Sequence, residues 1–412
     1  MKKARKDDKG RALKKGEYQR FDGSYEYRYV DPFKRNRAIY ADTLMALREE
    51  KNKLIKDQLD GIKTYKEGGA TVNYLFDRYI KTKTNLRPST MSNYKYMYNK
   101  FVRDTFGKNL ITEVKYSDVL MFYNQLISEK GLKIVTIENV HSSLHPAFEL
   151  AVRDNLIRKN PSDGVMATLK KGHATPKTTR HALTLAQQRK FMAFVSESPF
   201  FFKMEPLFTV MLGTGCRVGE VVGLRWRDID YENHRIVIDH NLVYFPQDGE
   251  KTRSCTFGVS LPKTDAGIRT IPMFPQVEEA LKRQKEYNRE NDVKSETIDG
   301  LTDFIFLTAN GKVITPRQIN QTIKRIIAAC NKAEEEKPHT DENPLVLLPD
   351  FSCHHLRHTF CTRLCENDTN VKVVQSVMGH ADISTTLDIY TDVSESKKNE
   401  AMMMLAENIN IF

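Results

Sequence analysis

The spacing of hydrophobic residues changes along the chain, and these changes mark out its parts. Between residues 71 and 166, apolar side chains recur at steps of three and four residues, which indicates helices that each bury one face. One of these helices should begin at Pro88, because proline is favoured in the first turn. We therefore predict a helical domain over residues 70–167. Its predicted core positions are Leu75, Tyr79, Tyr94, Met97, Phe101, Phe122, Leu126, Ile137, Val140, Leu144, Phe148 and Ala151.

Near the N-terminus the pattern has a period of two instead. Residues 18–30 form two alternating runs around an Asp-Gly turn, and another short strand follows. The helical period returns over residues 42–56. We predict a small ββ(β)α domain within residues 1–66, preceded by a flexible, highly charged arm at residues 2–15.

The second half of the chain mixes both periods. Residues 168–181 are polar and basic, are broken by glycine and proline, and are predicted to form a linker. Beyond them, helical periodicity alternates with strand patterns at residues 234–240 and 259–272. We predict a mainly helical domain over residues 182–395 with a small antiparallel sheet, followed by a C-terminal tail helix at residues 396–412. The fold class is thus multidomain and mainly α, with small β-sheets.

Polar residues suited to phosphodiester chemistry occupy defined places in the domain at residues 182–395. They are Arg217 between two glycines, Lys263 on the predicted last hairpin, His354, Arg357, His380 and Tyr390. Arginine forks onto phosphate oxygens, histidine can move protons, and lysine can protonate a departing 5′-hydroxyl. A tyrosine of pKa near 10 is only about a thousandth ionised at pH 7, so a nucleophilic tyrosine needs a base or cations beside it.

These residues, in this order, resemble the active site of the tyrosine recombinases, the phage-integrase family. The resemblance implies that Arg217, Lys263, His354, Arg357 and His380 assist Tyr390, which forms a 3′-phosphotyrosine with one DNA strand. It also implies neither metal nor cofactor, a tetramer on DNA, and a Holliday junction between two strand exchanges. The helical domain resembles the SAM-like core-binding domain of this family, and residues 1–66 resemble the arm-binding domain of integrases from conjugative transposons.

Two segments and one residue depart from the common pattern of the family. The insertions at residues 245–257 and 334–343 are longer than a minimal catalytic domain needs. His355 stands where an aspartate is common, at a position that lies off the catalytic face in the family. Glu220 is expected to be a buried partner that holds local groups, because a carboxylate facing the scissile phosphate would repel it.

Basic residues outside the six-residue motif are candidates for DNA contacts. The expected contacts are Arg20, Arg28, Lys34, Arg35, Arg37, Lys95, Lys100, Arg225 and Arg227, with Lys108 and Lys133 as further candidates. For the N-terminal group, the alternative is a solvated sheet edge with structural aromatic residues. For Arg225 and Arg227, which flank Trp226, the alternative is a structural role.

Charge supports a polyanionic partner. The net charge is +11, and residues 1–70 contain 19 Lys and Arg against 12 Asp and Glu, so this first sixth of the chain carries most of the excess. We see no run of apolar residues long enough to span a membrane and no signal-like segment. The six cysteines suggest neither disulfides nor, around His354, a zinc site. We expect a bacterial cytoplasmic, nucleoid-associated protein.

The sequence leads to one main hypothesis and two alternatives. The main hypothesis is an integrase that binds double-stranded DNA at core and arm sites, integrates and excises a mobile element such as a conjugative transposon, and is helped by an excisionase and a host DNA-bending protein. A type IB topoisomerase would use the same chemistry to relax supercoils. A regulator on a degenerate scaffold would bind DNA without cutting it.

Overall fold

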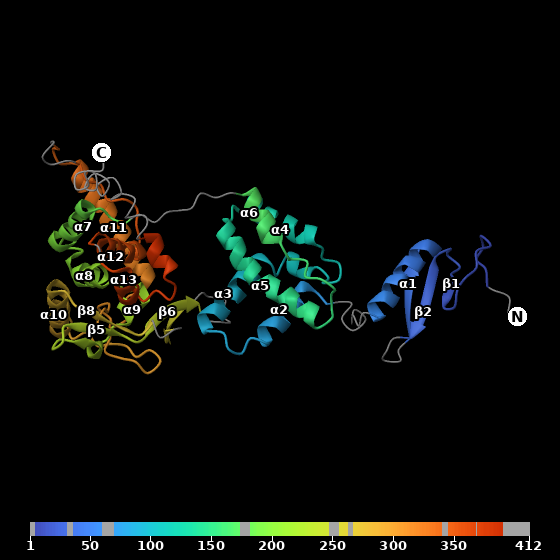
Figure 1. Cartoon of the computed structure of the whole chain (residues 1–412), viewed down its shortest axis with the longest axis horizontal. Coiled ribbons are helices and arrows are strands. Elements are labelled where there is room, and N and C mark those ends of the chain that lie inside the picture. Colours follow the sequence, from blue (N-terminus) through green and yellow to red (C-terminus); the bar gives the residue numbers. More distant parts are fainter. Residues whose placement is uncertain are drawn as a thin grey trace, which may run out of the picture. The chain divides into compact units, whose positions relative to one another are not determined.

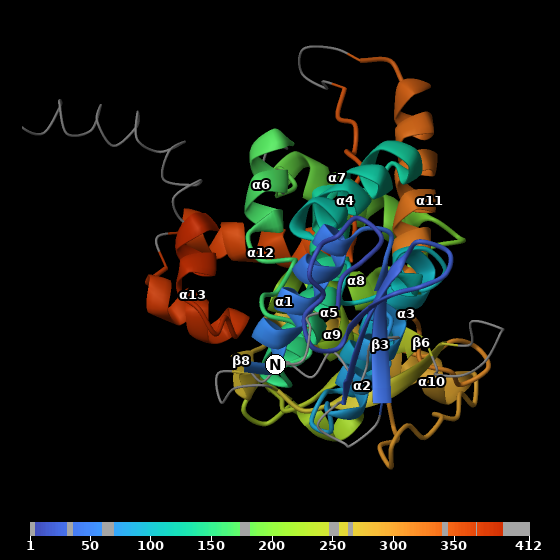
Figure 2. The same cartoon turned by 90° about the vertical axis from the view of Figure 1, so that its right-hand side faces the viewer.

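The computed structural model describes residues 5–30, 36–59, 70–173, 182–246, 255–262, 267–339, 345–367 and 369–389. The chain divides into two compact units, Met1–Pro176 and Lys177–Phe412, and each is considered by itself (Figures 1 and 2). Among the described helices, none is long and apolar enough to cross a membrane. Some predictions fall outside the described residues. These are the site residues Lys34, Arg35, Lys263 and Tyr390 and the tail helix at residues 396–412.

The N-terminal segment forms the predicted sheet and helix. The strands β1 (Glu17–Gln19), β2 (Tyr25–Val30) and β3 (Asn36–Ala41) form an antiparallel sheet in the order β1-β2-β3, and α1 (Leu44–Leu59) packs on one face. Its core is small: Tyr25, Leu44 and Leu47 are the buried hydrophobic residues. Polar contacts add to this core, because the buried Glu17 pairs with Arg48 and Lys51 of α1 at 3.2 and 3.0 Å.

The helical domain has its own core around the long helix α5. Its helices are α2 (Val72–Lys81), α3 (Pro88–Phe101), α4 (Tyr116–Lys130), α5 (Ile134–Arg153) and α6 (Val165–Gly172), with a short 3₁₀ turn η1 (Phe106–Lys108). Pro88 occupies the first turn of α3, as predicted. Nine of the twelve predicted core positions are buried, whereas Tyr94, Met97 and Phe101 of α3 are only partly buried. On α3 the fully buried aromatic residue is instead Tyr98, which stacks on Phe76.

The linker prediction is wrong at its N-terminal end. Lys170 and Lys171 form the last turn of α6 instead of irregular chain. Basic residues are favourable there, since the C-terminus of a helix carries partial negative charge.

In the second unit, further helices surround the apolar helix α8. These are α7 (Leu185–Glu197), α8 (Glu205–Thr214), α9 (Val218–Gly223), α10 (Pro275–Glu290), α11 (Pro316–Glu335), α12 (Cys353–Glu366) and α13 (Val371–Met378), with 3₁₀ turns η2 (Phe202–Met204) and η3 (Trp226–Asp228). Seven of the ten residues of α8 are buried, and α8 contacts α7, α9, α10 and α12. The helix therefore forms the centre of the hydrophobic core, and the sheet containing β5 and β8 lies to one side (Figure 1).

The strands of this unit pair differently from the prediction. The strands β4 (Ile229–Asp230), β5 (Arg235–Ile238) and β8 (Arg269–Pro272) form one antiparallel sheet, and β6 (Asn241–Pro246) pairs with β7 (Cys255–Ser260) in another. The two strands that flank Lys263 thus belong to different sheets, and the expected hairpin over residues 259–272 is wrong. Local alternation identified the strands but could not specify their partners.

Candidate active site

Arg217 projects from a sharp turn between α8 and α9. α8 ends at Gly215, whose φ of +61° is in the left-handed region that favours glycine. A Cβ at Gly215 would lie 2.3 Å from the Phe360 ring, so the close packing of α12 also requires glycine. Arg217 then forms the N-cap of α9 and remains 42% exposed, while its Nη1 donates to Glu220 at 2.8 Å. Its guanidinium is therefore fixed and still accessible.

Arg357 lies on α12, and its guanidinium is buried. Nη1 donates to the Gly215 carbonyl and Nη2 to the Met378 carbonyl, both at 2.6 Å. Burial, together with the nearby positive charge of Arg217, lowers the pKa of Arg357 to about 10. The group is still charged at neutral pH, but it lies where positive charge is not fully compensated. An anion would relieve this imbalance.

The two histidines of the His-x-x-Arg region have different roles in the local structure. His354 is exposed on α12, three residues before Arg357, and the two positions share one side of the helix. His355 turns its Nδ1 to the Ser352 backbone N–H at 3.1 Å and so helps cap the helix. A capping contact explains how histidine can replace the common aspartate without entering the site.

His380 follows the end of α13, where Gly379 has a φ of +63°. Its Nδ1 lies 2.9 Å from the hydroxyl of the fully buried Thr386. Burial first, and then the positive charges of Arg357 and Arg217, lower the pKa of His380 to about 4. His380 is therefore a neutral imidazole at physiological pH, held close to both arginines.

Glu220 confirms the expectation of a buried partner for local groups. It is 5% exposed and accepts from the Arg217 backbone N–H and from the guanidinium of Arg269, in each case at 2.8 Å. Burial alone would raise the pKa of Glu220, but hydrogen bonding and charge from Arg269 and the charge of Arg217 lower it. The carboxylate is thus ionised, and its charge is shared between two arginines.

Arg269 and Thr386 were not identified from the sequence. Arg269 is the first residue of β8, and its signal was its place on the buried side of an alternating strand, in phase with Ile271. In the sequence, Thr386 ends a polar run, Ser384-Thr385-Thr386, of a kind that can cap a helix, and this run carries no further signal. Its bond to His380 shows that the chain four residues before Tyr390 reaches the candidate site.

The predicted DNA-contact residues of the second unit, Lys177–Phe412, which contains the candidate active site and is called the catalytic unit below, differ in accessibility. Arg225 is 3% exposed and bonds Asp228 through two nitrogens, at 3.1 and 2.9 Å, which favours the structural alternative for this residue. Arg227 is 71% exposed, with Asp228 at 3.9 Å. Arg227 therefore stays a candidate for a DNA contact.

The N-terminal arginines lie on both faces of the sheet. Strand register places Arg28 opposite Ala38, and Arg37 opposite Tyr29, so these two arginines point to opposite faces. Arg20 lies over the Tyr40 ring and Arg28 over the Tyr18 ring, on the face away from α1. This arginine and tyrosine face is the stronger candidate surface for DNA. In the helical domain, Lys95 and Lys100 lie on α3.

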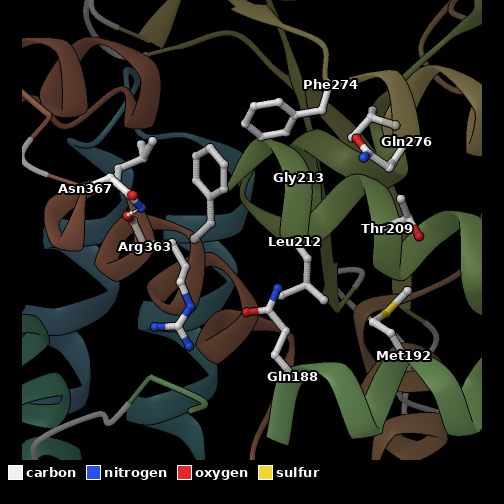
Figure 3. A pocket seen from close by; sticks show the side chains of 12 residues that line it. Gln188, Met192, Thr209, Leu212, Gly213, Phe274, Gln276, Arg363 and Asn367 are labelled. Atoms are coloured by element: carbon white, nitrogen blue, oxygen red, sulfur yellow. Dashed lines mark hydrogen bonds between the residues drawn. The ribbon is translucent and has the colours of Figure 1, made fainter. Parts of the chain in front are cut away.

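A cavity in the catalytic unit is distinct from the candidate site. It measures about 460 Å³ and lies among α7, α8, α12 and the start of α10 (Figure 3). Its walls are mainly apolar, and its lining also includes the amide and hydroxyl groups of Gln188, Thr209 and Gln276. The one cation in its wall, Arg363, already bonds Glu366 and the Leu183 carbonyl. This cavity lacks the charge that a phosphodiester requires.

Among the described residues, no three His, Cys, Asp or Glu side chains come together in a group that could hold a metal ion. Of the six cysteines, five are buried and Cys255 is partly buried, and all are free thiols.

Residues 181–397 match the family model described as the phage integrase family. The chain belongs to this family. Residues 1–58 match the family model described as the DNA binding domain of tn916 integrase. The expected family and fold class are confirmed.

Similar proteins support the integrase assignment over nearly the whole chain. The transposases from transposon Tn1545 of Streptococcus pneumoniae and Tn916 of Enterococcus faecalis are each 33% identical over 403 residues, covering 95% of this chain and 94% of the relative. A structure of the Tn1549 transposon integrase in complex with a circular intermediate DNA matches with a TM-score of 0.67 and 31% identity, covering 80% of this chain and 99% of that one. The protein is a site-specific tyrosine recombinase, and hence a DNA strand-transfer enzyme.

Proposed function

We propose that this integrase cuts and rejoins DNA through Tyr390, to integrate and excise a conjugative transposon. The observation that carries this proposal is the meeting of Arg217, Arg357 and the neutral His380 at the C-terminal end of α13. Two fixed guanidiniums in a partly desolvated place are suited to the charge that develops on a phosphate in its transition state.

Each group has a distinct role in the proposed reaction. Tyr390 attacks the scissile phosphate and forms a 3′-phosphotyrosine, and His354 accepts the phenolic proton. Arg217 and Arg357 hold the non-bridging oxygens, while His380 donates a hydrogen bond to the phosphate. Lys263 protonates the departing 5′-oxygen. The bond to the 5′-oxygen is replaced by an ester bond to tyrosine, which keeps the bond energy, so the 5′-hydroxyl of another strand can displace Tyr390 without ATP.

The proposed substrate is double-stranded DNA at two kinds of site. The helical domain and catalytic unit take the core site, with Lys95, Lys100 and Arg227 as candidate phosphate contacts, whereas the N-terminal sheet takes the arm site. Four protomers would exchange strands through a Holliday junction, assisted by an excisionase and a host DNA-bending protein. We place this reaction in the bacterial cytoplasm, at the nucleoid.

Tyr390→Phe tests the nucleophile directly. The variant should bind core-site DNA in a gel-shift assay as the wild type does, because phenylalanine removes only the hydroxyl. On a nicked suicide substrate it should form no covalent protein–DNA adduct, whereas the wild type should accumulate one whose DNA maps to Tyr390. An adduct that persists in Tyr390→Phe would refute this assignment. A plasmid relaxation assay run beside a two-site recombination assay separates integrase activity from topoisomerase activity.

A further inference from the structure

Three arginines donate hydrogen bonds to backbone carbonyls at the C-terminal end of α13. The carbonyls of residues 377, 378 and 379 are consecutive, and each accepts a hydrogen bond from a different guanidinium. The pairs are Arg269 Nε with Val377 at 2.7 Å, Arg357 Nη2 with Met378 at 2.6 Å and Arg217 Nη2 with Gly379 at 2.8 Å. The last carbonyls of a helix have no partner within it and carry partial negative charge, so three cations stabilise this end strongly.

Arg269 differs from Arg217 in its accessibility, and from the equally buried Arg357 in that it pairs with a carboxylate. Its side chain is 4% exposed, and each of its three guanidinium nitrogens donates to a protein atom. The hydrogen bonds of this buried guanidinium are directed to Val377, Glu220 and Cys216, so we expect Arg269 to affect DNA cleavage through its neighbours.

The neighbour that connects Arg269 to the active site is Glu220. Arg269 donates to Oε1 at 3.1 Å and to Oε2 at 2.8 Å, while the Arg217 guanidinium donates to Oε1 at 2.8 Å. One buried carboxylate thus lies between two arginines. Two guanidinium groups and one carboxylate leave one net positive charge, and Arg217, with 42% of its side chain exposed, is the arginine of this group that can present it to a substrate.

We propose that Arg269 is a positioning residue of the integrase, which takes up the charge of Glu220 and holds the Val377 end of α13, so that Arg217 keeps its charge and place for the scissile phosphate. This inference rests on the proposed role of Arg217. Without Arg269, the carboxylate of Glu220 would pair with Arg217 alone, and a neutral ion pair attracts a phosphate less than a free guanidinium does.

The test compares Arg269→Gln with the double variant Glu220→Gln/Arg269→Gln. The readout is the single-turnover rate of covalent adduct formation on a nicked core-site substrate at saturating protein, with gel shift and circular dichroism as checks on binding and folding. Arg269→Gln should bind DNA but form the adduct at least tenfold more slowly than the wild type. The double variant lacks the competing carboxylate and should form the adduct at least threefold faster than Arg269→Gln.

If Arg269 serves only in folding, the double variant should form the adduct no faster than Arg269→Gln, because it loses both members of a buried pair. That result, or an unchanged rate in folded Arg269→Gln, would overturn the proposal. If Arg269→Gln does not fold, the double variant is measured against Glu220→Gln. In this comparison, removal of Arg269 should slow adduct formation less than threefold. A slowing of tenfold or more contradicts the proposed charge competition.

Arg363→Gln is the matched control. Arg363 also donates to a carboxylate, Glu366, and to a backbone carbonyl, that of Leu183, but neither partner belongs to α13 or to the candidate site. Its variant should keep the wild-type cleavage rate per folded molecule. A wild-type protein that forms no adduct at Tyr390 would refute the proposed function itself, and this result is distinct from every outcome above.

Discussion

Hydrogen bonds to single side chains decide how the polar groups of the candidate site can act. His380 carries no charge at neutral pH, so its contribution depends on which ring nitrogen bears the proton. The Thr386 hydroxyl lies 2.9 Å from Nδ1 and can donate to it, which leaves the proton on Nε2. A proton on Nε2 would make His380 a hydrogen-bond donor toward the phosphate.

Thr386→Val should therefore slow adduct formation by about fivefold, since valine has the same shape and one neutral hydrogen bond contributes about 1 kcal/mol. Thr386→Ser keeps the hydroxyl and should stay within threefold of the wild-type rate. Single-turnover cleavage of the nicked substrate measures both variants, with gel shift as the control for DNA binding. A serine variant as slow as the valine variant would show that packing, and not the hydroxyl, matters.

At the scale of elements, the junction between α8 and α9 brings together backbone conformation, packing and chemistry. Gly215 ends α8 in a left-handed conformation, packs against Phe360 of α12, and offers its carbonyl to Arg357. A change at this turn should therefore affect both the stability of the catalytic unit and the placement of an active-site arginine.

Gly215→Ala tests this junction against Gly300→Ala. Both glycines have positive φ, but a Cβ at Gly300 would meet open space whereas one at Gly215 would collide with Phe360. Gly300→Ala should lower the free energy of unfolding by about 1–2 kcal/mol, the backbone cost alone. Gly215→Ala should lose about 1–3 kcal/mol more from overpacking. Urea unfolding measures the difference, and equal losses in the two variants would contradict the packing argument.

Elements were easier to predict than their partners. The period of hydrophobic residues identified the helices around Leu75 and Leu144 and the strands of the N-terminal sheet, because burial on one face leaves a local pattern. The hairpin at residues 259–272 was wrong, since the partners of β7 and β8 lie earlier in the chain.

The same limit applies to the candidate site. Arg217, His354, Arg357 and His380 stood out through motifs of a few residues. Arg269 meets Glu220 49 residues away and Val377 108 residues away, so no local pattern could reveal its contacts.

For the whole molecule, the separate cores allow separate functions. Hydrophobic residues of the N-terminal sheet, the helical domain and the catalytic unit form distinct clusters. Removing one segment should therefore leave the packing within the others unchanged.

Deletion of residues 1–68 tests this separation. The shortened protein should lose binding to arm-site DNA in a gel shift, because the arginine and tyrosine face of the N-terminal sheet is gone, but it should cleave a nicked core-site substrate at a rate within about threefold of the full chain. Its core-site affinity should still fall steeply with added salt, as expected for phosphate contacts. Undiminished arm binding would reject the role of this sheet.

The modest core of the N-terminal sheet has a consequence for how new specificities arise. Three buried hydrophobic side chains and a few ion pairs from Glu17 maintain this fold. Outward residues such as Arg20, Arg28 and Tyr40 are not among the buried residues of that core, so they can mutate without unfolding it. Integrases of related mobile elements could thus change which arm-site DNA they bind through substitutions at this surface, while the active site for strand exchange stays the same.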